Sequence, residues 1–531
     1  MWILPVFHLL LATICHQKIG YFFLNAKDPE YFHLMSGVAM SVFRLDTGYI
    51  DHPGIPIQII VAIASRITFW LDDSKSIIHD VIQHPETYVF VSNLLFNVVF
   101  AFVIFIIGIK TIKYTRDFRA GLLLQLGFFA NMYLITFSGR LVPDGFMLMP
   151  LGLLFLITIK YLYDEEEEKN WRRYLLQYSI LVGWGVATKL SFAPFALIPL
   201  IILPGLKKKA YFIGISILAF FVIAFPVLSH LNYFWDWTSN MIIHSGKWGQ
   251  GHADFINFAK VPERINALYV KDKMVFILSI ILLIQTIILK LSRFRPTQKF
   301  KRYLKVNTAI LGGLILMVLF IIKHFAWYYY VSTMLFKSLL IFLILWPLLF
   351  LKTRFLKQNH LWFGVALAFL MMVLSINNLA TSWFSDTRNH QLDRIVKFQK
   401  QVNQGDILIL SPHYAGAPYK QYGLAAGALM SGPAHKVFQK PLLEKYPNTY
   451  IYYEWANNFF HWFNYVTSED ILKKKKPIHI YVGRNKKTSL EVILNRFRDN
   501  NSSYSFDTKL EVSDKHGGDK LYRLKVSKKK E

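Results

Sequence analysis

Hydrophobic residues come in long blocks along this chain, separated by short polar segments. Most blocks are near the roughly 17–25 apolar residues that a helix needs to cross the hydrocarbon core of a membrane. We therefore predict about eleven transmembrane helices. The predicted spans are residues 2–22, 88–109, 120–137, 146–163, 174–189, 191–205, 210–229, 273–290, 306–323, 329–351 and 361–380.

Loop charge predicts how these spans are oriented. Lys and Arg gather in every second loop, for example in residues 110–119 and 290–305, and loops of this kind face the cytoplasm. The apolar segment 55–71 lies in a long outer loop, where we interpret it as an interfacial or re-entrant helix, because a full span there would invert every later loop. A second surface helix is predicted over residues 30–45. The predicted outer segments are 23–87, 138–145, 230–272, 324–328 and the chain after 380.

Composition supports a membrane protein. Of the 531 residues, 54% are hydrophobic, and the formal net charge is +27. In a soluble chain that charge would suggest nucleic acid as a partner, but no nucleic-acid motif accompanies it here. The Lys and Arg residues of the loops instead favour contacts with anionic headgroups of membrane lipids. The long Lys-rich tail and the unpaired cysteine indicate an inner (plasma) membrane of a bacterium. The single cysteine, Cys15, excludes an intrachain disulfide.

Beyond about residue 385 the pattern changes to short strands. The sequence therefore predicts a polytopic α-helical membrane domain over residues 1–384, including its first outer loop 23–87, and an extracytoplasmic, water-soluble α/β domain over residues 385–531. The predicted strands are 405–410, 449–453, 478–482, 509–512 and 521–526, with a helix at 489–498 and a hairpin turn at 516–519.

Three acidic segments fall in the predicted outer loops, and we expect them to meet on one side of the membrane as an active site. A general base needs a carboxylate that can take a proton at close range. Each segment also has a local interpretation, because Asp28 and Asp144 can cap helices and Asp51 can hold a turn. The predicted catalytic residues are Asp28, Glu30 and Asp144. Asp51 and His52, in the second segment, are predicted to position the acceptor or to act electrostatically.

Cationic and aromatic residues of the same loops complete the predicted site. Lys and His side chains can stabilise a departing phosphate while a carboxylate deprotonates the nucleophile. They can also simply extend towards the headgroups, and the aromatic run 327–330 can be an interfacial belt or a platform for a sugar. The candidate binding residues are Lys189, His244, Lys247, His252, Lys323, His324 and Tyr328.

In their order, these motifs resemble the polytopic glycosyltransferases of the C superfamily. In particular, they resemble the branch of the dolichyl-phosphate-mannose-protein mannosyltransferases and the lipid A aminoarabinose transferases. The resemblance covers the layout of residues 1–380. The motifs that carry it are Asp28-Pro29-Glu30-Tyr31, Tyr49 to Gly54, Pro143-Asp144, Thr188-Lys189 and the closing soluble domain.

The resemblance implies a polyprenyl-phosphate-linked sugar as the donor. It implies an inverting, single-displacement transfer at the outer face, to a hydroxyl or amine of a glycan, lipid or protein acceptor, with Asp28 as the base. The family often has two adjacent acids where this chain has Asp28-Pro29-Glu30, so the choice between the two carboxylates stays open.

A cofactor is not predicted from the residues themselves. Some branches of the family use a divalent cation, but no spacing of metal ligands is found in this sequence. Three other functions stay open: a ligase or polymerase of lipid-linked glycans, a transporter or flippase, and a receptor-like protein whose outer domain binds a partner. Transporters tend to have inverted repeats and ionisable groups near the bilayer midplane, whereas the charges noted here lie at the ends of spans.

Overall fold

The computed structural model describes the chain except residues 26, 52, 71–75, 167, 247–248, 250, 255, 292–296, 351–353, 384–386, 413–415, 454–455, 485–489, 500, 515–517 and 530–531. The chain forms two compact units. The helical unit comprises Met1–His16, Ile50–Ile60 and Asn93–Phe384, and the sheet unit comprises Gln17–Tyr49, Val61–Ser92 and Ser385–Glu531.

Up to residue 383, the described part of the chain is helical wherever it has regular structure. The α-helices are α1 (Ile3–Ile19), α2 (Phe22–Asn25), α3 (Lys27–Ser41), α4 (Ile55–Trp70), α5 (Ile77–Gln83), α6 (Pro85–Thr115), α7 (Phe118–Leu126), α8 (Met132–Ser138), α9 (Pro143–Phe146), α10 (Leu148–Tyr163), α11 (Trp171–Thr188), α12 (Leu197–Ile202), α13 (Leu206–Ile223), α14 (Leu231–Ile243), α15 (Val261–Lys271), α16 (Lys273–Leu291), α17 (Gln298–Lys323), α18 (Val331–Met334), α19 (Phe336–Leu345) and α20 (Arg354–Trp383). Short 3-10 helices are η1 (Gly127–Phe129), η2 (Leu190–Ala196), η3 (Phe225–His230), η5 (Phe258–Lys260), η6 (Trp327–Tyr330) and η7 (Trp346–Phe350).

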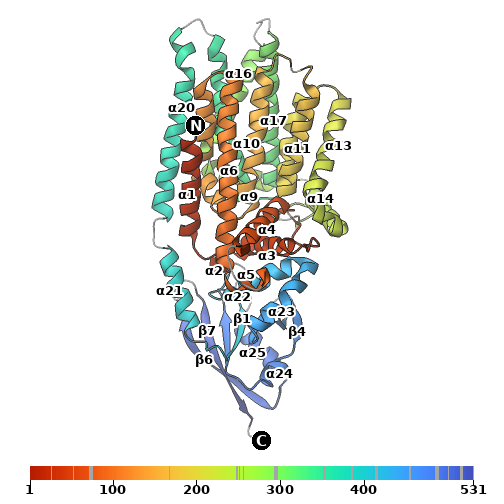
Figure 1. The fold of residues 1–531 in the computed structure, drawn as a ribbon, viewed down its shortest axis with the longest axis vertical. Helices are drawn as coiled ribbons and strands as arrows, with labels where there is room; N and C mark the ends of the chain where they lie inside the picture. Colours follow the sequence, from red (N-terminus) through yellow and green to blue (C-terminus); the bar gives the residue numbers. More distant parts are fainter. Residues whose placement is uncertain are drawn as a thin grey trace. The chain divides into compact units, whose positions relative to one another are not determined.

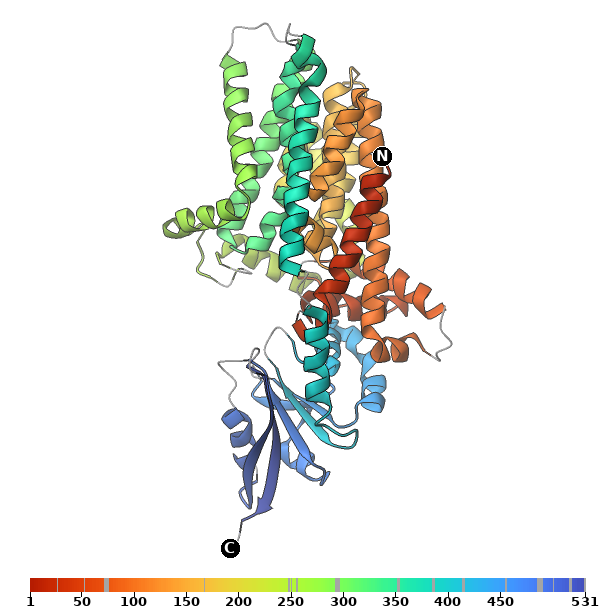
Figure 2. The same cartoon turned by 90° about the vertical axis from the view of Figure 1, so that its left-hand side faces the viewer.

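Long apolar helices run side by side in the helical unit, among them α6, α10, α16, α17 and α20 (Figures 1 and 2). Among the described residues, five helices are long and apolar enough to cross a membrane, and the number rises to eight if each of three bent pairs is one span. The predicted number of eleven is therefore not confirmed. The apolar segments Ile3–Ile19, Ile55–Trp70 and Leu190–Ile202 are helical but shorter.

Polar caps explain why one predicted span is bent. The block 120–137 forms α7, η1 and α8, and its two halves meet at an angle of 73°. Asn131 lies at the break, where its side chain accepts a hydrogen bond from the backbone N–H of Tyr133. Such a cap starts a new helix instead of continuing the old one. A hydropathy average does not register this single polar residue.

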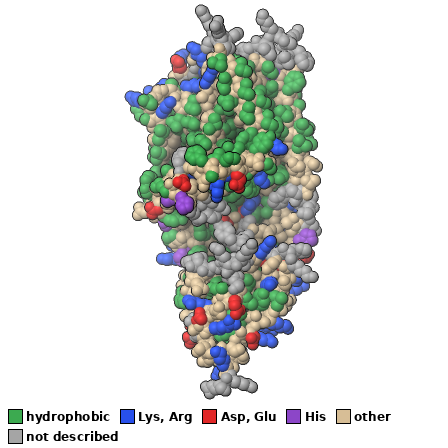
Figure 3. Space-filling model, turned by 180° about the vertical axis from the view of Figure 1, so that it is seen from behind, with side chains coloured by type: hydrophobic (Ala, Val, Ile, Leu, Met, Phe, Trp, Pro, Cys, Tyr) green, Lys and Arg blue, Asp and Glu red, His purple; other side chains and the backbone are tan. Residues whose placement is uncertain are grey.

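The surface of the helical unit is apolar. Hydrophobic side chains cover much of the face shown in Figure 3, and only 22% of the apolar stretch of α16 is buried. Contiguous apolar surface of this extent mediates aggregation in water but contacts lipid tails in a bilayer. The protein is therefore an integral, multi-pass membrane protein.

The sheet unit contains one seven-stranded sheet in the order β4-β3-β2-β1-β5-β7-β6. Strand β1 pairs in parallel with β2 and with β5, and the other neighbours are antiparallel. The strands are β1 (Ile407–Ser411), β2 (Thr449–Tyr453), β3 (Asn458–His461), β4 (Asn464–Val466), β5 (Ile478–Val482), β6 (Tyr504–Ser513) and β7 (Lys520–Lys528). The helices are α21 (Thr387–Gln399), α22 (Lys420–Met430), η8 (Gly432–His435), α23 (Lys436–Lys445), α24 (Ser468–Leu472) and α25 (Leu490–Asp499).

Every second side chain of the central strands points into the core of this unit. Ile407 and Ile409 of β1 and Ile478 and Ile480 of β5 point into a buried cluster with Phe497 of α25. The predictions for β2 and β5 are confirmed, and α25, β1, β6 and β7 lie at the predicted places with longer or shifted ends. The predicted turn at 516–519 falls between β6 and β7 in the sequence, and residues 516 and 517 of it lie outside the described residues.

The segment before residue 50 packs on the C-terminal part of the chain. In α22, Gly427 lies so close to α3 that an added Cβ would come within 2.3 Å of the Tyr31 carbonyl oxygen. The backbone N–H of Gly48 donates to the Ser431 carbonyl at 2.8 Å. From the sequence, loop 23–87 was predicted to belong to the membrane domain. In the structure, Gln17–Tyr49 and Val61–Ser92 belong to the sheet unit.

Candidate functional site

Asp144 and Lys189 form a buried ion pair in the helical unit. The Lys189 ammonium donates to both carboxylate oxygens of Asp144 at 2.8 Å, and the side chains are only 3% and 6% exposed. Both residues were predicted site residues. Burying two charges costs several kcal/mol for each ion, which the attraction within the pair has to offset. A pair of this kind is weak evidence for stability and stronger evidence for function.

Helix ends place the two charges. Asp144 lies in the first turn of α9, where the cap position is occupied by Val142, so the predicted role of Asp144 as a cap is not observed. The N-terminus of a helix favours a carboxylate in its first turn. The neighbouring Gly145 lets α9 approach α8, because a Cβ there would lie 2.4 Å from the Phe137 carbonyl oxygen. Lys189 follows α11 with an extended backbone and leads directly into η2.

Two tyrosine rings cover the ammonium. The Lys189 Nζ lies 4.3 Å from the ring centroid of Tyr329 and 5.1 Å from that of Tyr328. Cation–π contacts at these distances contribute about 0.5–2 kcal/mol each. Tyr329 is buried and Tyr328 is half-buried, so Tyr328 offers the more accessible ring. The aromatic run that follows α17 therefore contacts a cation, beyond any role in a membrane belt.

The second acidic segment is attached to the same corner. The backbone N–H of Gly54 donates to the Thr188 carbonyl at 3.2 Å, next to Lys189. Asp51 accepts a hydrogen bond of 3.0 Å from the Tyr233 hydroxyl. The structure thus links two of the three predicted acidic segments through residues 188 and 189. We call Asp51, Asp144, Lys189, Tyr328 and Tyr329 the Lys189 site; His52 lies outside the described residues.

The predicted cations Lys323 and His324 anchor a loop. Lys323 Nζ donates to the Ile242 carbonyl oxygen, and His324 Nδ1 donates to the Gly246 carbonyl oxygen at 3.0 Å. Burial lowers the pKa of His324 below its ordinary value, and the hydrogen bond to Gly246 opposes this shift. These contacts hold the segment after α14 against the end of α17.

The loop itself is closed by hydrogen bonds to its own backbone. The N–H of Ser245 donates to the His252 carbonyl at 2.9 Å, and His244 Nδ1 lies 3.1 Å from the Gly251 carbonyl oxygen. The predicted residues His244 and His252 therefore serve the fold of the loop in this structure. Lys247 lies outside the described residues.

Asp28 and Glu30 belong to the sheet unit. Asp28 has extended backbone angles within α3 (φ −103°, ψ 123°), as expected for a residue before proline, and is half-buried. Glu30 is fully buried. The next residue, Tyr31, donates from its hydroxyl to Glu86 at 3.1 Å. Of the two candidate bases, Asp28 is thus the more accessible.

Sequence reasoning missed a second buried ion pair. Lys337 Nζ donates to Asp272 at 2.6 Å, and both side chains are nearly inaccessible. Asn131 donates to the same carboxylate at 2.9 Å. Lys337 lies within the predicted span 329–351, and an isolated lysine in an apolar block was the signal that could have identified it.

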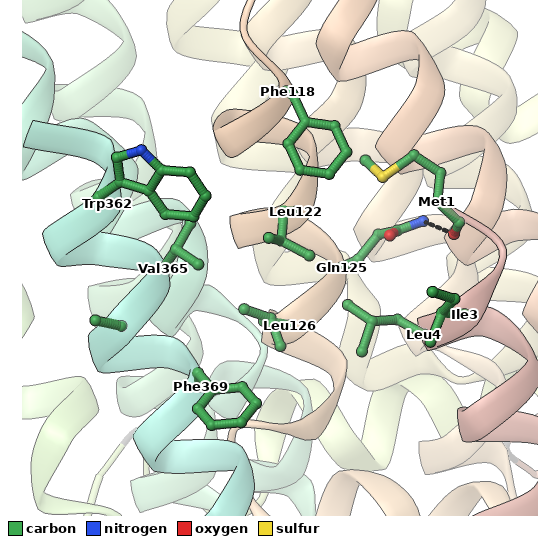
Figure 4. A pocket seen from close by; sticks show the side chains of 11 residues that line it. Met1, Ile3, Leu4, Phe118, Leu122, Gln125, Leu126, Trp362, Val365 and Phe369 are labelled. Atoms are coloured by element: carbon green, nitrogen blue, oxygen red, sulfur yellow. Dashed lines mark hydrogen bonds between the residues drawn. The ribbon is translucent and has the colours of Figure 1, made fainter. Parts of the chain in front are cut away.

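A separate apolar pocket of about 470 Å³ lies between α1, α7 and α20 (Figure 4). Its lining holds Gln125 as a polar side chain, which donates to the carbonyls of Met1 and Ile104 at 3.1 Å. Among the described residues that line it, none is a carboxylate, Lys, Arg or His. Such a surface can accommodate a lipid chain but carries no group for catalysis. No cluster of three or more His, Cys, Asp or Glu suited to a metal ion occurs in the described part of the chain.

Sequence comparison with protein-family models and with curated proteins finds no match. Among solved structures, the chain is similar to ArnT from Cupriavidus metallidurans bound to undecaprenyl phosphate, with 10% identity and a TM-score of 0.48 over 98% of this chain and 97% of that chain. The structure of ArnT from the same organism in the apo state gives 9% identity and a TM-score of 0.49 with the same coverage.

Proposed function

We propose that this protein is a membrane glycosyltransferase that takes a sugar from a polyprenyl-phosphate-linked donor. The sugar is transferred to a hydroxyl or amine of a glycan, lipid or protein on the extracytoplasmic side of a bacterial inner membrane. The buried Asp144–Lys189 pair beneath Tyr328 and Tyr329 carries this proposal. A costly ion pair at the ends of apolar helices is expected where a membrane protein handles a charged group.

The chemistry of the donor fits a site at the end of a helix bundle. A polyprenyl chain stays in the bilayer, so its phosphate lies at the depth of the headgroups. A lysine ammonium there stabilises the negative charge that develops on the phosphate as the sugar departs. Asp144 holds the ammonium in place, and the accessible ring of Tyr328 offers a face on which a sugar can pack.

The transfer is a single displacement. The acceptor oxygen or nitrogen attacks the anomeric carbon while its proton passes to the base, the bond from that carbon to the phosphate oxygen breaks, and polyprenyl phosphate leaves. Attack opposite to the leaving group inverts the anomeric carbon. We assign the base to Asp28, because a general base has to reach the proton it accepts and Asp28 is more exposed than Glu30.

Purified protein in lipid vesicles with a radiolabelled polyprenyl-phosphate sugar tests the proposal. We expect label to appear in the acceptor with the wild type and to be lost with Asp28→Asn. A matched control is Glu469→Gln, which neutralises an exposed carboxylate of the sheet unit and leaves transfer unchanged. Equal transfer by the wild type and Asp28→Asn would remove the assignment of the base. Counting the sugars moved in each event separates a single transfer from a ligase or polymerase.

A further inference from the structure

A second pocket, which we call the Lys271 pocket, lies in the helical unit and is separate from the Lys189 site. Its volume is about 280 Å³, which suits a lipid headgroup better than a whole sugar chain. It is formed where α8 begins, where α15 ends and where α20 approaches its end. The lining residues are Asn131, Met132, Tyr133, Val270, Lys271, Ser375 and Asn378.

The inner wall of this pocket is fixed by the second buried ion pair. Lys337 Nζ donates to Asp272 and to the Ala130 carbonyl oxygen, each at 2.6 Å. Asn131 of the lining donates to Asp272, and its side-chain oxygen accepts from the N–H of Tyr133. The carboxylate of Asp272 is thus neutralised inside the wall and does not repel an anion in the pocket.

Lys271 contributes a positive charge that is not balanced locally. Its Nζ lies 4.9 Å from the ring centroid of Trp327 and 5.5 Å from that of Tyr133, and 3.4 Å from the Tyr133 hydroxyl. In the described ranges of the chain it forms no ion pair with a carboxylate. An ammonium held between two rings with no counter-ion attracts an anionic ligand.

The other polar groups of the lining can donate hydrogen bonds. The Tyr133 hydroxyl accepts from Lys271, so its own O–H remains available to donate. Asn378 adds an amide and Ser375 a hydroxyl, and the described lining includes no carboxylate. One cation with several neutral donors matches a phosphate, which has several acceptor oxygens.

The position of the pocket points to a lipid. The apolar stretch of α16 begins at Lys273, and that of α20 ends at Thr381, so Lys271 and Asn378 lie at the ends of apolar stretches. Beside the pocket, Leu374 of α20 is 53% exposed. A phosphate bound at Lys271 would therefore lie at headgroup depth, with room for its chains along exposed apolar helix surface.

We propose that the Lys271 pocket binds the phosphate headgroup of a membrane lipid. The pocket and the Lys189 site share the η6 turn, in which Trp327 contacts Lys271 and the next residue, Tyr328, contacts Lys189. The two sites nevertheless use different lysines. The proposal of lipid binding at Lys271 therefore does not depend on the proposed glycosyltransferase activity.

Native mass spectrometry of the full chain in phosphatidylcholine nanodiscs tests this proposal, with phosphatidic acid as the probe. We expect saturable binding of phosphatidic acid to the wild type. Lys271→Gln should weaken it at least about tenfold, since the charge-assisted hydrogen bond between the ammonium and the phosphate is lost. Asn378→Leu, a change at an exposed residue, should weaken it less but measurably.

The matched control is Lys273→Gln, two residues further on at an exposed position outside the pocket, and it should bind like the wild type. Unchanged binding by Lys271→Gln, or an equal loss in Lys273→Gln, would overturn the site. A large excess of inorganic phosphate should leave the bound phosphatidic acid in place, and its complete displacement would overturn the lipid as ligand. Transfer activity measured in the same discs reports separately on the Lys189 site.

Discussion

The Lys189 ammonium donates to both oxygens of the Asp144 carboxylate across a sequence separation of 45 residues. The contact joins the end of α11 to the start of α9. Both helices belong to the helical unit, whose surface is apolar. Because the tyrosines of η6 close over the lysine, one ion pair connects three stretches of chain. Its role can be separated from its contribution to stability by substitution.

Removing one partner of this pair should destabilise the protein strongly. We expect Lys189→Met to lower the free energy of unfolding by about 3–5 kcal/mol, because Asp144 is left buried without its counter-charge. The double variant Asp144→Leu/Lys189→Met should regain most of that loss, since both charges are gone. Thermal unfolding in detergent and transfer in vesicles are measured together. A double variant that regains activity as well as stability would make the pair purely structural.

The two carboxylates of α3 should differ in their effect on transfer. Asp28→Asn keeps the size of the side chain and removes the base, so we expect a loss of about a hundred- to ten-thousand-fold in rate. Glu30→Gln alters a fully buried group and should mainly lower the melting temperature. Initial rates of sugar transfer, measured at equal amounts of folded protein, show which carboxylate is the base. A larger loss of rate in Glu30→Gln would transfer the role of base to Glu30.

Packing of α22 on α3 should be sensitive to one methyl group. Gly427→Ala would place a Cβ 2.3 Å from the Tyr31 carbonyl oxygen, and we expect a loss of about 1–3 kcal/mol from the strain. Transfer should fall too, because α3 also carries Asp28. Gly405→Ala is the control, since a Cβ there meets no atom within 4 Å. Equal melting temperatures for the two variants would contradict this account of the packing.

The loop anchored by His324 should loosen in acid. Burial lowers the pKa of His324 below its ordinary value of 6.5, so between these two values the unfolded chain binds a proton that the folded protein does not. Stability should therefore decrease as the pH falls below about 6.5. His324→Gln keeps a hydrogen-bond donor without a titrating ring and should flatten this dependence.

Melting temperatures of the wild type and of His324→Gln, measured from pH 8 to pH 5, test this dependence of stability on pH. The control is His79→Gln, because the His79 side chain is 53% exposed. This control should retain the wild-type dependence. A slope in His324→Gln equal to that of the wild type would show that another group causes the acid sensitivity.

Hydropathy and alternation predicted most elements but not the bends between them. The strands β2 and β5 coincide with the predicted ranges, whereas β3 and β4 were missed. These two strands are joined by Trp462 and Phe463, both with positive φ. Such turns normally contain Asn or Gly, so this sequence gave no signal for a hairpin.

Site residues that belong to a local sequence motif could be predicted, whereas residues that are brought together only by tertiary packing could not. Asp144, Lys189 and Tyr328 were identified from their places beside apolar blocks, and they meet in the structure. The pairing of Asp272 with Lys337 joins residues 65 positions apart, and no local pattern records it. The use of Lys323 as a loop anchor likewise depends on a backbone carbonyl that the sequence does not distinguish.

Mass spectrometry of envelope lipids and glycans tests the central claim most directly. The comparison is between otherwise identical cells that contain the wild type, the Asp28→Asn variant or no protein. If the protein is a glycosyltransferase, we expect one envelope molecule to carry an additional sugar in the cells with the wild type and in neither of the other cells. Cells with the Asp28→Asn variant or without the protein should instead accumulate polyprenyl-phosphate-linked sugar. Identical lipids and glycans in all three would contradict it.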